Sequence, residues 1–134
     1  MSLLDRARAS LSNESIDPHA RPVLVVEDDA GLRAFLVSVL ERQGFRVVAA
    51  GSGEEAFDLL AGERAQLAVL DIGLPGMDGF AVAEQLEGVP VIIVTGDPVA
   101  AYARAHENVP RYRVLPKPIA SELLEHAVEE ILPT

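Results

Sequence analysis

The residues of this sequence that could do chemistry lie at the ends of apolar segments. Three are carboxylic acids, one is a hydroxyl and one is an ammonium group: Glu27, Asp28, Asp71, Thr95 and Lys117. The two leading acids follow the apolar run VLVV, while the other groups end LAVLD, end VIIVT and stand inside VLPKPI. Carboxylates about 4 Å apart repel one another by about 1–4 kcal/mol for each pair, depending on the dielectric. If the fold gathers these groups, the three acids therefore require cations beside them.

A divalent metal ion together with Lys117 would balance the three carboxylates. Hard carboxylate oxygens with no His or Cys among them favour Mg²⁺ over a softer metal, with Mn²⁺ as the alternative ion. Lys117 stands between Pro116 and Pro118, and each proline fixes its own φ and biases the preceding residue toward extended backbone. We therefore predict a Mg²⁺ site at the three acids, with the Lys117 ammonium held as their counter-charge.

The elements that must position these groups alternate five times between strand and helix. Strands are expected at residues 23–26, 45–50, 67–71, 90–96 and 112–115. Helices are expected between Asp29 and Gly44, from Ser52 to Leu60, from Phe80 to Leu86, from Pro98 onward and from Ser121 to Leu132.

These strands are continuous apolar runs, as in a parallel sheet that helices cover on both faces. The sequence thus predicts a doubly wound α/β domain, in which the carboxyl ends of the strands share the ligand-binding edge. Asp29, Asp78 and Asp97 precede helices, and we interpret them as N-caps rather than site residues.

Composition narrows the class of protein. A chain of 134 residues with 49% hydrophobic content suits one domain, and residues 1–21 are interpreted as a polar leader, either a short helix or disordered, before a domain at 22–134. The formal charge of −10 leaves no broad basic surface, so direct nucleic-acid binding is not expected. The sequence has no cysteine. Its apolar runs are all much shorter than the about 20 residues that a membrane-spanning helix needs. We predict a cytoplasmic protein without membrane insertion.

Four segments of the sequence carry a family resemblance. The segments VVEDD, VLDIGLPGMDG, VTG and LPKP, in this order at the ends of the expected strands, resemble the receiver domain of bacterial two-component response regulators, the CheY-like superfamily. The resemblance covers about residues 22–134. It implies a flavodoxin-like three-layer sandwich with strand order 2-1-3-4-5 and a cis peptide bond between Lys117 and Pro118.

The resemblance also assigns roles to the site residues. It implies that Asp71 accepts a phosphoryl group from a histidine kinase or a histidine phosphotransfer protein. Asp28 would bind Mg²⁺ directly and Glu27 through water, with the Gly73 carbonyl as a further ligand. Thr95 and Lys117 would contact phosphoryl oxygens.

Phosphorylation would then switch binding to a downstream protein target, in a monomer or a phosphorylation-dependent dimer. The protein would not be an enzyme beyond self-catalysed phosphoryl transfer to Asp71 and autodephosphorylation.

Two alternatives remain beside this interpretation. One is a receiver-like module that binds partners without being phosphorylated. The other is a nicotinamide-dinucleotide enzyme, because GSGEEA at residues 51–56 matches the G-x-G-x-x-A pattern after a strand and at a helix start. Against it, Glu54 and Glu55 would place two carboxylates beside the pyrophosphate, where the helix N-terminus favours anions.

Two departures from the family pattern concern signal transmission. Where the family usually has an aromatic residue on the fifth strand, this sequence has Val114, and Tyr112 lies two residues earlier. The segment between Asp71 and Thr95 is also short. We therefore hypothesise that the signal passes through the loop after Thr95 and the alanine-rich helix that begins near Pro98.

Overall fold

The computed structural model describes residues 20–74 and 76–132 of the chain. Nearly all of the predicted leader, including the short helix considered for it, lies outside the described residues. At its junction with the domain, the backbone carbonyl of Ala20 accepts hydrogen bonds from the Arg46 side chain at 3.0 and 2.8 Å. None of the helices in the described ranges combines the length and apolar character needed to cross a lipid bilayer.

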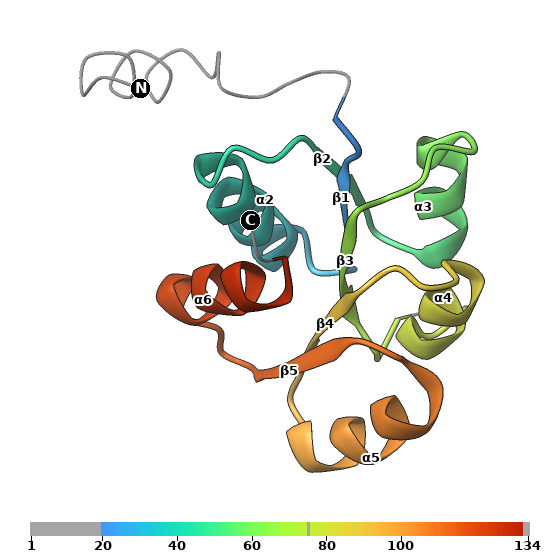
Figure 1. Cartoon of the computed structure of the whole chain (residues 1–134), viewed down its shortest axis with the longest axis vertical. Coiled ribbons are helices and arrows are strands. Elements are labelled where there is room, and N and C mark those ends of the chain that lie inside the picture. Colours follow the sequence, from blue (N-terminus) through green and yellow to red (C-terminus); the bar gives the residue numbers. More distant parts are fainter. Residues whose placement is uncertain (1–19, 75, 133–134) are drawn as a thin grey trace.

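Five parallel strands form a single sheet in the order β2-β1-β3-β4-β5 (Figure 1), which confirms the predicted fold class and strand order. Their bounds are Val23–Val26 for β1, Val47–Ala50 for β2, Leu67–Asp71 for β3, Val91–Thr95 for β4 and Tyr112–Pro116 for β5. In β1, β3 and β4 every residue is buried. This burial explains why these strands read as uninterrupted apolar runs instead of alternating patterns.

The helices that follow the strands are α2 at Ala30–Arg42, α3 at Gly53–Leu60, α4 at Gly79–Gln85, α5 at Pro98–Asn108 and α6 at Ser121–Ile131. The aspartates predicted as N-caps have that role: Asp29 accepts a hydrogen bond from the Gly31 amide, Asp78 from Ala81 and Asp97 from Ala100. Pro98 occupies the first turn of α5, and Gly44 follows the C-cap of α2 with a φ of 94°. Local sequence therefore sets most of the helix starts.

Strands β1 and β3 have the predicted bounds, while several other boundaries differ by one or two residues. The second strand begins at Val47 instead of residue 45, and the fourth covers Val91–Thr95 instead of 90–96. Helix α4 begins at Gly79 rather than Phe80 because Asp78 caps it. Such ends depend on single hydrogen bonds, which hydrophobic periodicity does not report.

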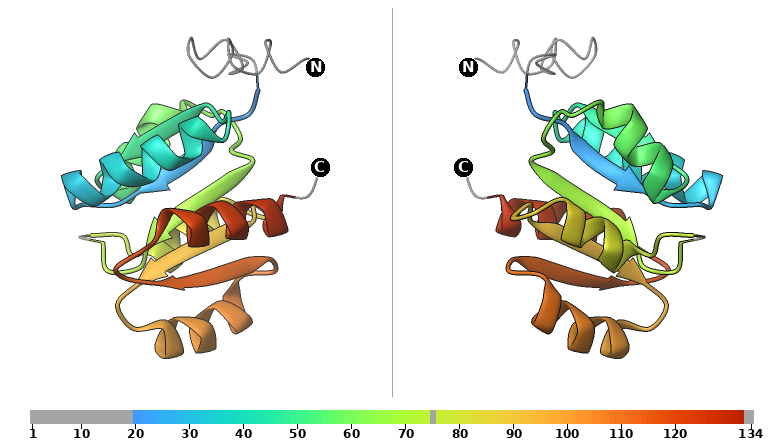
Figure 2. Two further views of the ribbon diagram at one scale, coloured as in Figure 1. Left: turned by 90° about the vertical axis from the view of Figure 1, so that its left-hand side faces the viewer. Right: turned by 90° about the vertical axis from the view of Figure 1, so that its right-hand side faces the viewer.

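Helices cover both faces of the sheet, with α2 and α6 on one face and α3, α4 and α5 on the other (Figures 1 and 2). Each face has its own hydrophobic core. One contains Leu36 and Leu40 of α2 with Leu124 and Ile131 of α6. The other contains Leu60 of α3, Val82 of α4 and Ala101 of α5. The carboxyl ends of the strands emerge between the two layers, at one edge of the sheet.

Candidate functional site

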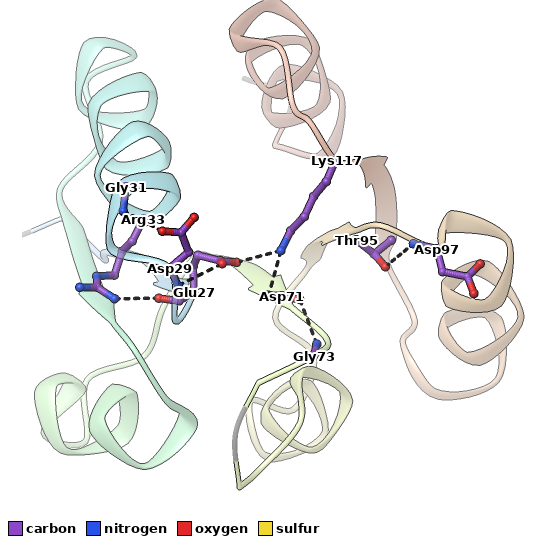
Figure 3. Close-up of polar contacts among 9 residues, drawn as sticks. All are labelled: Glu27, Asp29, Gly31, Arg33, Asp71, Gly73, Thr95, Asp97 and Lys117. Atoms are coloured by element: carbon purple, nitrogen blue, oxygen red, sulfur yellow. Dashed lines mark hydrogen bonds and ion pairs between the residues drawn. The ribbon is translucent and has the colours of Figure 1, made fainter.

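The predicted site residues meet at this carboxyl edge. Glu27 and Asp28 follow β1, Asp71 ends β3, and Lys117 follows β5 directly. Glu27, Asp28 and Asp71 each offer a carboxylate oxygen within 4.8 Å of the others. Figure 3 shows the Lys117 side chain reaching from its loop to a point between Glu27 and Asp71.

Lys117 pairs with two of the three acids. Its Nζ donates a hydrogen bond to Asp71 Oδ2 at 3.1 Å and lies 3.5 Å from Glu27 Oε2. Burial alone would lower the pKa of Lys117, but the hydrogen bond to Asp71 and the charges of Asp71 and Glu27 outweigh it and raise the pKa above 10.5. The ammonium therefore stays charged, as a counter-charge must. The peptide bond between Lys117 and Pro118 is cis, as predicted.

Glu27 is a buried acid with spare binding capacity. Its side chain is 1% exposed, its Oε1 accepts a hydrogen bond from the Asp29 amide at 3.3 Å, and its Oε2 accepts none within the described part of the chain. Burial, and next the charge of Asp71, raise the pKa of Glu27 to about 7. Asp28, by contrast, is exposed.

Glu27 Oε2 thus has the Lys117 ammonium 3.5 Å away but accepts no hydrogen bond among the described residues. A buried carboxylate oxygen without a hydrogen bond favours a further cation or donor. This need and the all-oxygen donor set fit Mg²⁺.

The Asp71 carboxylate is oriented by the loop that follows it. It is 8% exposed, and its Oδ1 accepts a hydrogen bond from the Gly73 amide at 2.9 Å. A Cβ at position 79 would lie 2.5 Å from the Asp71 carbonyl oxygen, so Gly79 allows α4 to begin directly against the backbone of Asp71. Gly73 thus orients the Asp71 carboxylate through its amide, while the predicted metal contact of its carbonyl stays a prediction.

Thr95 lies at the same edge, and its hydrogen bonds are to backbone amides. Its Oγ1 accepts a hydrogen bond from the Asp97 amide at 3.0 Å, and its carbonyl oxygen accepts one from the Lys117 amide at 2.8 Å. The first bond leaves the hydroxyl proton of Thr95 available to another acceptor. The second ties the backbones of Thr95 and Lys117 together, so the two donors share one support.

One residue that contacts the site was missed in the sequence. Arg33 of α2 donates from Nη1 to the carbonyl oxygen of Glu27 at 2.9 Å (Figure 3). The sequence feature that could have indicated this contact is an arginine in the first turns of the helix that follows the acidic pair. Its partner is a backbone carbonyl, however, and side-chain patterns do not reveal such partners.

The structure gives the GSGEEA segment a packing role. A Cβ at Gly53 would lie 2.8 Å from a Val82 methyl and 3.1 Å from Met77 Sδ, so this glycine lets α3 approach α4. Ser52 caps α3 by accepting from the Glu55 amide at 3.2 Å. The Glu55 carboxylate in turn accepts a hydrogen bond from the Gly51 amide at 3.2 Å. Gly53 is thus explained by helix packing, without a dinucleotide.

Strand β5 has Val114 where the family usually has an aromatic residue, and its aromatic residue is Tyr112. Val114 is buried in the core under α3, α4 and α5, paired in register with Ile93. Tyr112 packs against the same core and meets Tyr102 of α5 edge-on, with ring centroids 6.0 Å apart. Tyr112 therefore contacts α5, while Thr95 is paired in register with Pro116 at the other end of β5.

Comparison with known proteins identifies this arrangement. A family model described as the response regulator receiver domain matches residues 23–129. The transcriptional regulatory protein AfsQ1 of Streptomyces coelicolor is 35% identical over 115 residues, which cover 82% of this chain and 50% of AfsQ1. The sporulation initiation phosphotransferase F of Bacillus subtilis is 29% identical over 115 residues, covering 83% of this chain and 93% of that protein. The chain thus spans half the length of AfsQ1 but most of the second relative.

Solved structures agree. The non-phosphorylated receiver domain of HemR from Leptospira biflexa superposes with a TM-score of 0.75 at 28% identity, covering 86% of this chain and 96% of that one. Fold, edge location and family model therefore converge: the chain belongs to the response regulator receiver domain family of two-component systems.

Proposed function

We propose that the protein is a phosphoacceptor in a two-component phosphorelay and that Asp71 is the residue that is phosphorylated. The observation that carries this proposal is the Asp71 carboxylate, with Lys117 Nζ at 3.1 Å and the acids Glu27 and Asp28 beside it. A histidine kinase or histidine phosphotransfer protein is the proposed donor. The family match and the two bacterial relatives support this choice of donor.

In the proposed reaction a carboxylate oxygen of Asp71 attacks the phosphorus of a phosphohistidine. The new O–P bond forms as the N–P bond breaks, and the imidazole nitrogen keeps the electron pair and is protonated. Nucleophile and entering group are both anionic, so cations must reduce their repulsion. Mg²⁺ held by Glu27, Asp28, Asp71 and the Gly73 carbonyl, with Mn²⁺ as substitute, would supply that charge neutralisation.

Lys117 and Thr95 then stabilise the phosphorylated Asp71. The Lys117 ammonium pairs with one phosphoryl oxygen and the Thr95 hydroxyl donates to another. Since the phosphoryl group adds negative charge to a crowded edge, the loops that carry Thr95 and Lys117 rearrange to meet it. The protein thereby changes its affinity for a downstream protein target, as a monomer or as a phosphorylation-dependent dimer.

The proposed activity is a switch and not substrate turnover. Hydrolysis of the acyl phosphate by water resets Asp71, so the protein acts on itself and releases no modified substrate. This role belongs in the cytoplasm and needs neither nucleic-acid contact nor membrane insertion by this domain.

Phosphorylation by a small donor tests the proposal. Incubation with acetyl phosphate and Mg²⁺ is expected to add the mass of one phosphoryl group, and Asp71→Asn is expected to abolish the addition. Asp58→Asn is the matched control because Asp58 is an exposed acid of α3. EDTA should suppress labelling of the unaltered protein. Undiminished labelling of Asp71→Asn would contradict the assignment, and an unlabelled but folded protein would favour the phosphorylation-independent module.

A further inference from the structure

Arg33 contacts the candidate metal site without being one of its ligands. We propose that Arg33 is a positioning residue, whose guanidinium fixes the peptide between Glu27 and Asp28 so that both carboxylates face Asp71. This inference rests on the proposed Mg²⁺-dependent function and names a residue that sets the metal affinity of that site.

The contact is made to the backbone that joins the two acids. Arg33 Nη1 donates to the carbonyl oxygen of Glu27 at 2.9 Å in a partly buried position. That carbonyl belongs to the peptide unit linking Glu27 to Asp28. Rotation of the unit would swing the exposed Asp28 side chain away from the 4.8 Å cluster that it forms with Glu27 and Asp71.

Two other hydrogen bonds hold the same turn. The Glu27 amide donates to the Ala50 carbonyl at 3.0 Å, and the Asp29 amide donates to Glu27 Oε1 at 3.3 Å. Together with the Arg33 bond they restrain both ends of the Glu27 backbone and one of its carboxylate oxygens. Of the three, the Arg33 bond alone comes from a side chain that is not a proposed ligand. It can therefore be removed without altering the ligands themselves.

Gly51 supplies the space that the guanidinium occupies. A Cβ at position 51 would lie 3.2 Å from Arg33 Nη1 and 3.7 Å from Glu55 Oε2. The 3.2 Å separation from Arg33 Nη1 is tighter than ordinary van der Waals contact, so an added methyl would displace the guanidinium by a few tenths of an ångström. The bare backbone after β2 thus forms one wall of the Arg33 site.

The direction in which Mg²⁺ affinity changes when Arg33 is replaced distinguishes a positioning role from a purely electrostatic one. A cation near three carboxylates repels Mg²⁺, so deleting its charge should tighten Mg²⁺ binding if charge were all that mattered. Loss of a positioning contact should weaken it instead, and loss of such outer contacts typically reduces metal affinity about 10–100-fold. The two roles therefore predict opposite changes.

The test is a Mg²⁺ titration of the full chain followed by NMR, giving Kd for the unaltered protein, Arg33→Met and Arg42→Met. Arg42 is exposed in the last turn of the same helix, so its loss removes the same charge away from the site. We expect Arg33→Met to raise the Kd about tenfold. Arg42→Met should leave it within about twofold, because distant charges are screened. An unchanged or lower Kd in Arg33→Met would overturn the inference.

Gly51→Ala gives a second and independent variant, which keeps the charge and moves the guanidinium. It is expected to weaken Mg²⁺ binding several-fold, with thermal unfolding in EDTA close to that of the unaltered protein. If Arg33→Met does not fold, Gly51→Ala decides, and an unchanged Kd there would overturn the inference. If the unaltered protein itself binds no Mg²⁺ at millimolar concentration, the proposed function fails instead.

Discussion

Asp78 shows how one side chain joins two helices. Its Oδ1 accepts from the Ala81 amide at 2.9 Å as the N-cap of α4, and its Oδ2 lies 3.4 Å from Arg104 Nη2 of α5. The bond from Ala81, and beside it the bond and charge of Arg104, hold the pKa of Asp78 below 3.8. Its stabilising effect is therefore complete above the pKa of the unfolded chain and is lost as pH falls through the lower folded pKa.

We predict that Asp78→Ala lowers the free energy of unfolding by about 1 kcal/mol at neutral pH, because the cap is lost. The gap between the two proteins should begin to shrink below about pH 4, where Asp78 of the unfolded chain becomes protonated. It should close as the pH falls through the lower pKa of the folded residue. Asp78→Asn is the control, since its amide oxygen keeps the cap without the charge. Urea unfolding across this pH range checks the prediction, and a gap that does not change with pH would contradict it.

At the scale of single residues, the sequence predicted the acids and Lys117 because strand ends of a parallel sheet share one edge. Their types then restricted the chemistry. Arg33 could not be found in this way, since its partner is a carbonyl and its space depends on Gly51, a residue of another loop. The direction of the Thr95 hydroxyl was equally hidden, because a loop amide at Asp97 decides it.

Among the elements, α5 is weakly anchored to the sheet. Its side chains at Ala101 and Ala105 are fully buried, but alanine contributes little apolar area, while Val99 is 80% exposed and Tyr102 50%. Its further contacts include those of Arg104, which lies 4.2 Å over the Phe80 ring and pairs with Asp78, and the Tyr102–Tyr112 ring contact. Little apolar burial marks an element with low local stability.

We predict that a phosphoryl mimic changes α5 more than any other helix. Hydrogen exchange with and without beryllofluoride and Mg²⁺ should show the largest differences at residues 96–110. The reason is that Thr95 leads directly into this segment, so a hydroxyl drawn toward the phosphoryl group releases the Asp97 amide that it now accepts from.

The Tyr102–Tyr112 contact provides the control for this prediction. Tyr112→Ala removes an edge-on pair worth about 0.5–1.5 kcal/mol and should raise the basal exchange of α5. The additional change caused by beryllofluoride should nevertheless persist, because the proposed route runs through Thr95 and the following loop. Loss of the beryllofluoride response in Tyr112→Ala would show that an aromatic couple carries the signal, against the hypothesis.

For the whole molecule, the alternation of apolar runs and amphipathic segments was enough to predict the doubly wound class. The strand order came from the family resemblance, since periodicity does not say which strands are neighbours. Where the helices end depends on individual caps such as Asp78, and the close approach of α3 and α4 depends on Gly53 meeting Val82. Such contacts join segments distant in the chain, and a local pattern does not contain them.

The two separate hydrophobic cores have a consequence for the energetics of the fold. Ile93 packs under α3, α4 and α5, whereas Ile131 packs with α2 on the opposite face. Ile93→Val and Ile131→Val should each lower the unfolding free energy by about 1 kcal/mol, because each removes one buried methylene. The double substitution should cost the sum of the two within about 0.5 kcal/mol, since the two side chains lie in separate cores.

Denaturant unfolding of the four proteins in this cycle measures the difference from additivity. A coupling energy well above about 0.5 kcal/mol would mean that the sheet transmits packing strain from one core to the other. With additivity, the sheet insulates its two faces thermodynamically. Substitutions that accumulate under α2 and α6 would then leave the energetics of the face that carries α5 unchanged.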